Sequence, residues 1–295
     1  MRIFAALLFA LLLTACSAVT YVQVENAPSP NALPTEAAEM MVTAEEEQSI
    51  YYQADTVMHG DTRKTDDGTT LFSYAVEVPE LTAWREDGTQ ITEAQNPAEE
   101  KALQTVQAFH ERFTVWYADE TLEELERTAT EDLKWKKEEN IDWYDGYQVE
   151  LNSSVYQTEL LVSVSAEYYA YTGGAHPNTY LLGWTFDLEN GAFYGPENLA
   201  GQELQAAVCE EIIRQAETRA AEENMKPEEF FWPEYQEIIA EWTNYAVSFD
   251  EEGMNVAFSP YELAAYAAGA QEFKMPYEWL KEYLDEHSIE VLGLN

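Results

Sequence analysis

The sequence predicts an α+β fold made of two small packed modules, in which antiparallel β-hairpins and sheets are flanked by helices. Three observations lead to this prediction. Apolar and polar residues alternate along 158–168 and 180–188, as expected for half-buried strands. Apolar residues recur with helical spacing from about 97 to 117 and again from about 201 to 223. Strands and helices occur in clusters without a regular alternation, which is typical of an α+β protein.

The first residues have the features of a bacterial lipoprotein signal. Arg2 precedes an apolar run, Ile3 to Leu13, which is too short to cross a bilayer core, since that takes about 20 helical residues. A short apolar run followed by small residues is typical of a cleaved secretory signal. Leu13-Thr14-Ala15-Cys16 resembles the lipobox of bacterial lipoproteins. This resemblance implies removal of residues 1–15 and a diacylglyceryl group on Cys16; the alternative is an ordinary signal peptide with a chance cysteine.

A lipid on Cys16 predicts an extracytoplasmic protein anchored to the bacterial cell membrane. Two acyl chains suffice for stable anchoring, whereas one chain binds a bilayer only marginally. Residues 16–45 show no sustained periodicity and contain Pro28, Pro30 and Pro34. We therefore expect this segment to be a flexible tether between the bilayer and the folded part.

The composition is strongly acidic but rich in core-forming residues. The chain has 56 acidic and 15 basic residues, a net charge of −41, and 46% of its residues are hydrophobic. So many apolar residues allow a large core despite the charge. The acidic surface argues against nucleic acid as a partner and favours cationic proteins or divalent cations, although it is equally compatible with adaptation to a habitat. With Cys16 lipidated, only Cys209 remains, so no intramolecular disulfide is possible.

The N-terminal module is expected to span 46–190. Strands are predicted at 50–59 and 69–78, around an Asp67-Gly68 turn. Asn96-Pro97-Ala98-Glu99 predicts a helix start, and a second helix follows over about 122–137. The predicted apolar face of the first helix is Leu103, Val106, His110, Phe113 and Tyr117, with His110 as a packed core residue. The loop Thr172–Asn178 then joins the two alternating strands as a hairpin.

The C-terminal module is expected to span 191–285, followed by a tail over 286–295. A helix over 201–223 is followed by a hairpin over 245–258. Ser259-Pro260-Tyr261-Glu262 has the pattern of a capping box with proline at the first helical position, and predicts a short helix that ends near Gly269. A last strand is expected near 273–275, and Pro276 is expected to begin a terminal helix.

Two stretches of the chain match a known family. Residues 171–179 (YTGGAHPNT), with Phe186-Asp187-Leu188 and Gly191, resemble one characteristic stretch of RsiV-like extracellular domains. The segment 259–277, through SPYELA, YAAG, EFK and PY, resembles their closing stretch, and Val78-Pro79-Glu80-Leu81 is a weaker early match. The resemblance covers about 50–284 and implies two α+β modules that pack as one unit.

The resemblance also implies a binding function. The family includes the lysozyme-binding ectodomain of an anti-sigma factor and a non-catalytic N-terminal region of a peptidoglycan deacetylase. We expect this chain to differ from both, because it has neither a cytoplasmic sigma-binding segment nor an appended deacetylase domain. The resemblance therefore implies a stand-alone binding module on a lipid anchor.

The candidate ligand-binding residues come from the two matching stretches. They are Gly173, Gly174, His176 and Pro177 in the first stretch, and Pro260 and Tyr261 in the second. Two adjacent glycines allow backbone conformations that other residues resist, and Pro177 restrains the residue before it. Two interpretations of His176 stay open: a ligand contact, or a structural turn in which the imidazole bonds to the backbone. Tyr261 is likewise either a contact or part of the hairpin end.

No pattern in the sequence indicates catalysis. The four histidines have no zinc-ligand spacing, and neither a nucleophile elbow nor a phosphate-binding loop occurs. We therefore expect a non-enzyme without cofactor or metal that binds a basic protein such as lysozyme. The alternatives are a peptidoglycan or glycan binder and, third, a hydrolase that uses a pair of its many carboxylates. Aromatic residues in 142–147 and 230–235 either stack on sugars or anchor these loops in the core, and the second interpretation is favoured.

Overall fold

The computed structural model describes residues 49–141, 143–199 and 202–294. The predicted signal (1–15), the whole of the predicted tether (16–45) and residues 46–48 lie outside the described residues. The described residues belong to one compact unit. Among the residues that the structure describes, no helix combines the length and the apolar character needed to cross a membrane.

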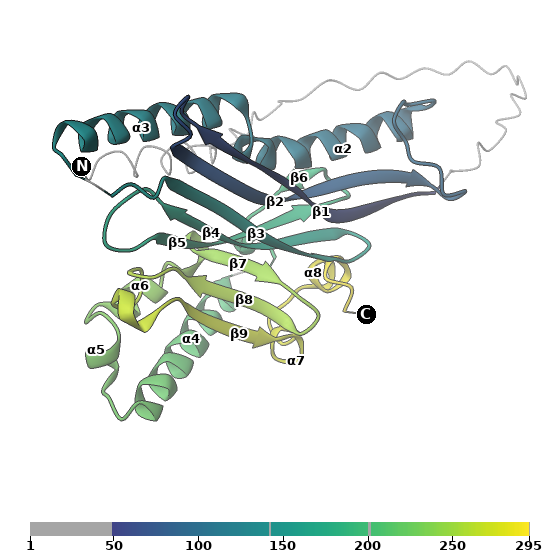
Figure 1. Ribbon diagram of the computed structural model, residues 1–295. Helices are drawn as coiled ribbons and strands as arrows, with labels where there is room; N and C mark the ends of the chain where they lie inside the picture. The colour runs from purple at the N-terminus through teal and green to yellow at the C-terminus, as the bar shows by residue number, and fades with distance from the viewer. Residues whose placement is uncertain (1–48, 142, 200–201, 295) are drawn as a thin grey trace, which may run out of the picture. The chain divides into compact units, whose positions relative to one another are not determined.

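A six-stranded sheet forms the centre of this unit (Figure 1). Its strands pair in chain order, antiparallel except for the parallel pair β2–β3. The helices α2 and α3 lie between β2 and β3 in the sequence, and this crossover allows the parallel pairing. The strands are β1 (Ile50–Lys64), β2 (Thr70–Arg85), β3 (Tyr147–Gln157), β4 (Leu161–Tyr171), β5 (Asn178–Asp187) and β6 (Ala192–Phe193).

Helices α2 (Pro97–Phe113) and α3 (Asp119–Glu138) cover one face of this sheet (Figure 1). Phe109 packs edge-on against Phe186 with ring centroids 5.2 Å apart. The predicted cap of α2 is confirmed, since the Asn96 side chain accepts a hydrogen bond from the Glu99 amide at 3.0 Å. His110 was predicted to be a packed core residue; it is only partly buried, and its Nε2 accepts a hydrogen bond from the Leu81 amide at 3.0 Å.

The predicted apolar face of α2 is shifted by one position. The buried residues are Glu99, Ala102, Thr105, Phe109 and Phe113, whereas the predicted Leu103, Val106 and His110 are only partly buried. The apolar residues of α2 cover a wide arc, so the sequence fits a buried face centred on either set of positions. The deeper face contains Thr105 and Glu99, and these polar residues conceal it in the sequence.

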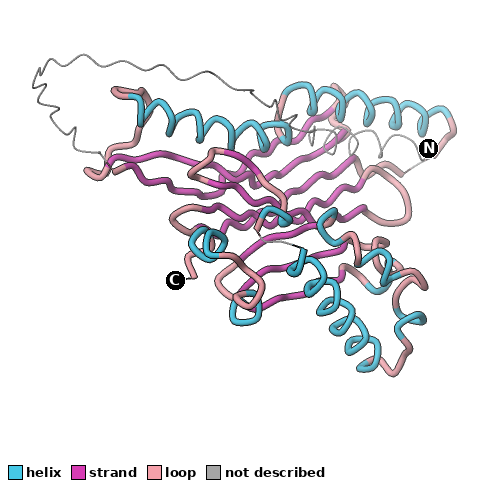
Figure 2. Tube along the Cα trace, turned by 180° about the vertical axis from the view of Figure 1, so that it is seen from behind, coloured by secondary structure: helices cyan, strands magenta, loops and turns pink. Residues whose placement is uncertain are grey.

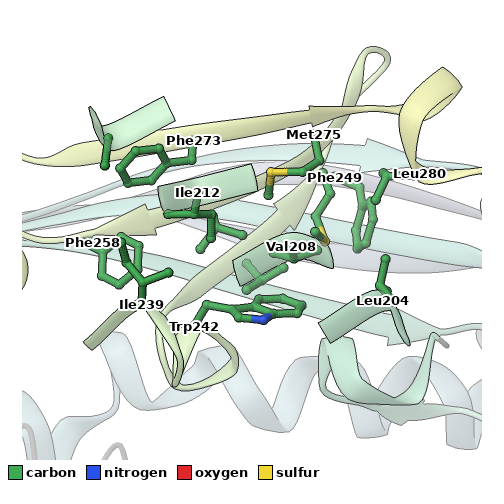
Figure 3. Packing of buried hydrophobic residues seen from close by; sticks show 14 of the residues in the cluster. Leu204, Val208, Ile212, Ile239, Trp242, Phe249, Phe258, Phe273, Met275 and Leu280 are labelled. Atoms are coloured by element: carbon green, nitrogen blue, oxygen red, sulfur yellow. The ribbon is translucent and has the colours of Figure 1, made fainter. Parts of the chain in front are cut away.

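A second, three-stranded antiparallel sheet lies on the opposite face of the first sheet (Figure 2). It consists of β7 (Ala246–Phe249), β8 (Gly253–Phe258) and β9 (Gln271–Pro276). Its outer face packs on α4 (Gln202–Glu222), which contributes Leu204, Val208 and Ile212 (Figure 3). Trp242 and Ile239 close this core from the segment before β7 (Figure 3). The short helices are α5 (Pro227–Phe230), α6 (Tyr235–Ile239), α7 (Tyr277–Leu280) and α8 (Glu286–Val291).

The two sheets are joined by close backbone contacts. Gly183 on β5 lies against Val247 on β7, where a Cβ atom on residue 183 would overlap the Val247 backbone. The Phe249 amide of β7 donates to the Ser163 hydroxyl of β4 at 2.7 Å. The Leu181 amide of β5 donates to the Ser259 hydroxyl at 3.0 Å. The two sheets are therefore held at a defined separation.

Three expectations about the C-terminal part need correction or comment. The predicted helix does not begin at Ser259: 259–262 is a tight turn, in which the Glu262 amide donates to the Ser259 carbonyl at 3.0 Å. A single 3-10 turn, Tyr266–Ala268, ends at Gly269, where the helix end was predicted. The segment 286–295 is not a simple tail, because α8 buries Val291 and Leu292 in the core. The sheet of the N-terminal module also continues past residue 190, since β6 pairs with β5.

Candidate functional site

The hairpin between β4 and β5 has the predicted tip. The two strands pair in register from Leu161↔Asp187 to Ala170↔Asn178, so residues 172–177 form the connection. Gly173 and Gly174 have φ values of +82° and +127°, a region that glycine adopts without steric cost. The Tyr171 hydroxyl donates to the Gly174 carbonyl at 3.3 Å. These contacts give the tip one defined conformation and leave His176 exposed.

The second matching stretch forms the turn that follows β8. Pro260 precedes Tyr261, whose φ is +76°, as a type II turn requires at its third residue. A tyrosine in this region is strained, and such strain persists only where the surroundings impose it. Trp232 helps to hold this backbone conformation, because its Nε1 donates to the Tyr261 carbonyl at 3.0 Å.

Glu262 fixes the base of the same turn. Its carboxylate accepts a hydrogen bond from the Ser259 amide at 2.5 Å. Burial raises the pKa of the Glu262 carboxyl. Hydrogen bonds to the Glu262 carboxylate and from the Trp232 ring thus stabilise the turn. The Tyr261 residue itself is 54% exposed.

The two stretches meet in space, although 85 residues separate His176 from Tyr261. The His176 ring stacks on the Tyr266 ring with centroids 4.2 Å apart and planes at 23°. The Tyr261 ring lies 5.4 Å from the Tyr266 ring and 6.1 Å from the His176 ring. We call His176, Tyr261 and Tyr266 the aromatic cluster. It joins the tip of the β4–β5 hairpin to the turn after β8.

The hydrogen bonds of His176 define its tautomer. Nδ1 lies 2.8 Å from the Pro177 carbonyl, which can only accept, so Nδ1 carries the proton and donates. The other ring nitrogen, Nε2, lies 3.4 Å from the Tyr261 hydroxyl. Of the two roles left open by the sequence, the structure shows the bond to the backbone, and His176 is also exposed.

The remaining candidates flank the cluster or point elsewhere. Pro177 and Pro260 shape the two turns. Gly173 lies toward α3, where a Cβ atom would be 3.6 Å from Lys136 Nζ. That ammonium is 4.1 Å from the centroid of the Trp143 ring, in a cation–π contact. Tyr266 and Trp232 were missed as site residues, although Tyr266 belongs to the matching YAAG stretch.

The other features that the sequence singled out have structural roles. Phe231 and Tyr235 are buried, and the Tyr144 hydroxyl bonds to the carbonyls of Leu71 and Ala129, so the two aromatic loops mainly anchor the chain in the core. The Cys209 thiol lies 3.7 Å from the Ile239 carbonyl, and burial raises its pKa, which disfavours the reactive thiolate. In residues 49–141, 143–199 and 202–294, no group of three or more His, Cys, Asp and Glu side chains could hold a metal ion.

Two protein-family models match successive parts of the chain. Residues 66–179 match the model described as "Deacetylase PdaC", and residues 197–278 match a protein of unknown function, DUF3298. The first match ends three residues after His176, and the second contains Tyr261 and Tyr266. The aromatic cluster therefore forms where the two matched segments meet.

A solved structure shows a similar fold at low sequence identity. A DUF3298 family member from Bacteroides fragilis has a TM-score of 0.53 and 16% identity, over 84% of this chain and 99% of that one. A DUF3298 family protein from Pseudomonas aeruginosa PAO1 has a TM-score of 0.44 and 14% identity, over 80% of this chain and 95% of that one. No curated protein sequence matches the chain. The chain is therefore similar to the PdaC model in its first half and to the DUF3298 model in its second, and its fold is similar to that of a DUF3298 family member.

Proposed function

We propose that this protein is a non-catalytic cell-envelope module that binds a basic protein, with lysozyme as the example, through the aromatic cluster. The observation that carries the proposal is the convergence of the two matching stretches. His176, Tyr261 and Tyr266 come from distant parts of the sequence and meet in one exposed group. Tyr261 adopts its strained φ within this group, as residues at ligand contacts often do.

The chemistry of the cluster suits a cationic partner. Exposed tyrosine ring faces attract guanidinium and ammonium groups, with about 0.5–1 kcal/mol for each exposed cation–π contact. Tyrosine is also common among the few residues that dominate protein interfaces, because a rigid ring buries much surface at a small entropy cost.

The overall charge supports the same partner. A net charge of −41 attracts a basic protein over several ångströms and accelerates association, in a manner that salt screens. Two contributions are thus separable: the charge sets the association rate, and the cluster sets the dissociation rate.

The test is the binding of the purified protein to immobilised lysozyme. We expect saturable binding at low salt and slower association as salt rises. Tyr261→Gly relieves the backbone strain while it removes the ring, so it should leave the fold intact and speed dissociation by about tenfold or more, the loss typical of an interface hot spot. His176→Ala should act in the same direction.

Tyr51→Ala is the matched control. Tyr51 is a similarly exposed tyrosine, 44% exposed, on β1 and outside the cluster. It should bind as wild type does. The proposal fails if lysozyme shows no saturable binding at low salt, or if folded Tyr261 and His176 variants bind unchanged.

Peptidoglycan binding is the second candidate. Trp143 favours it, because 53% of this residue is exposed in a loop whose other aromatic residues are anchored. One face of its ring is already covered by Lys136, which leaves less surface for a sugar. A pull-down with insoluble peptidoglycan, compared between wild type and Trp143→Ala, separates this candidate from lysozyme binding.

A further inference from the structure

A hollow of about 480 Å³ opens between the facing surfaces of the two sheets, apart from the aromatic cluster. We call it the inter-sheet groove. Its volume lies within the roughly 300–1,000 Å³ typical of small-molecule sites. One wall belongs to β3, β4 and β5, and the other to β7, β8, β9 and the turn at Asp250. The polar lining residues are Asn152, Ser154, Ser165 and Glu167 on the first wall, and Ser248, Asp250, Asn255, Glu272 and Lys274 on the second.

This polar lining is unusual for two packed sheets. Facing sheets normally fill the space between them with interdigitating apolar side chains. Here the hollow is open to solvent, and Ser248 is the buried residue among its polar lining, whereas Asn152, Ser154, Ser165, Glu167 and Glu272 are exposed. The strand pairing explains the location: Asn152 lies opposite Glu167, and Ser154 opposite Ser165, so all four side chains belong to the face that looks toward the second sheet.

Several of these groups have no protein partner. Within the part of the chain that the structure describes, no hydrogen bond engages the side chains of Asn152, Ser154, Ser165 and Ser248. Ser248 is the most informative, because this residue is only 8% exposed and nevertheless borders the groove. Donors and acceptors that are free in the protein thus converge on one hollow from both walls.

The inter-sheet groove is preformed. The bonds Phe249–Ser163 and Leu181–Ser259 and the close approach at Gly183 hold the two sheets together beside it. On the second wall, the Asp250 carboxylate accepts from Lys274 Nζ at 2.9 Å and from the Asn255 side-chain Nδ2 at 2.8 Å. A preformed wall loses little entropy on binding.

The hydrogen-bonding groups that line the groove indicate which class of ligand fits it. Hydroxyls and carboxamides both donate and accept, as the hydroxyl groups of sugars do, and Glu167 adds a strong acceptor. The lysine is neutralised, since Lys274 also pairs with Glu252 at 2.6 Å, so an anionic ligand has no free cation to bind. We propose that the inter-sheet groove binds a short, neutral saccharide chain.

The experiment is an NMR titration of the ¹⁵N-labelled protein with two probes, the tetrasaccharides of glucose and of N-acetylglucosamine, at millimolar concentrations. At least one should cause saturable shifts in the amide signals of 152–154, 165–167 and 246–250. Ser248→Val and Glu167→Gln should each weaken binding by about tenfold, the effect of losing one well-formed hydrogen bond. Ser248→Ala provides a milder replacement if the valine variant does not fold.

Glu159→Gln is the matched control, because Glu159 is exposed in the β3–β4 turn and does not line the groove. Its affinity should equal that of wild type. The proposal is overturned if neither tetrasaccharide shifts the groove signals. It is also overturned if the shifts concentrate at His176, Tyr261 or Trp143, or if the folded Ser248 and Glu167 variants bind as well as wild type. Lysozyme takes no part in this test, so its outcome is independent of the function proposed above.

Discussion

The buried carboxylate of Glu99 connects the start of α2 to β2 through hydrogen bonds. Its side chain is 1% exposed and accepts two hydrogen bonds from the Arg85 guanidinium, at 2.7 and 2.9 Å, and one from the Gln95 amide at 2.8 Å. The sequence identified Glu99 as the third residue of a helix start, but not its partner Arg85 on β2. These hydrogen bonds, above all those from Arg85, lower the pKa of the Glu99 carboxyl.

The lowered pKa makes a prediction about pH. Because the folded protein favours the charged carboxylate, the stabilisation is complete above the glutamate pKa of the unfolded chain, about 4.3. It is lost as pH falls through the lower pKa of the folded protein. Glu99→Gln should therefore destabilise the protein at neutral pH, and the difference from wild type should shrink in acid. Urea unfolding at several pH values measures this; a difference that stays constant down to acid pH would contradict it. Glu93→Gln, in the exposed segment before α2, is the control.

At the scale of elements, the contact between β5 and β7 decides how the two sheets meet. Gly183 is required there, since any side chain would overlap the Val247 backbone. Neighbouring positions on β5 carry Leu182 and Trp184, so nothing in the sequence distinguishes Gly183 from an ordinary weak point of a strand. Only the packing of a second sheet against it explains the residue.

Gly183→Ala should consequently destabilise the protein by about 1–3 kcal/mol or more, the usual cost of overpacking. The control is Ser165→Ala on β4, the residue that pairs with Gly183. Ser165 is exposed, and its change should stay within about 0.5 kcal/mol. Thermal or urea unfolding of both variants gives the comparison. Equal stability of the two variants would show that the sheets can separate at this point without cost.

For the whole molecule, the lipid anchor is a proposal that follows from Leu13-Thr14-Ala15-Cys16. We expect Cys16→Ser to move the protein from the membrane fraction to the soluble fraction, because the acyl chains would have no thiol to join. Cys209→Ser is a matched control, since Cys209 is the other cysteine and lies in α4. Fractionation and mass spectrometry of the N-terminus measure the result. Wild type in the soluble fraction, or an intact Met1, would refute the anchor.

The sequence by itself determined the α+β class, the cap at Asn96, the β4–β5 hairpin and the β7–β8 hairpin. These features depend on residues close in the chain: a side-chain cap three residues away, or alternation along a single strand. The segment 259–262 shows the limit of such local signals. Its Ser-Pro-Tyr-Glu pattern fits both a helix start and a tight turn, and the bond of the Ser259 hydroxyl to Leu181 on another strand favours the turn.

Only the tertiary structure decided what distant residues build together. The sequence named His176 and Tyr261 as separate candidates, and the pairing of strands brought them to one aromatic cluster with Tyr266. The serines and asparagines of the inter-sheet groove look in the sequence like the solvent-facing positions of strands. A second sheet, formed about 80 residues later in the chain, lies against that face, so these exposed residues border an open hollow. Alternation reports which residues share a face, but it does not report what comes to lie against that face.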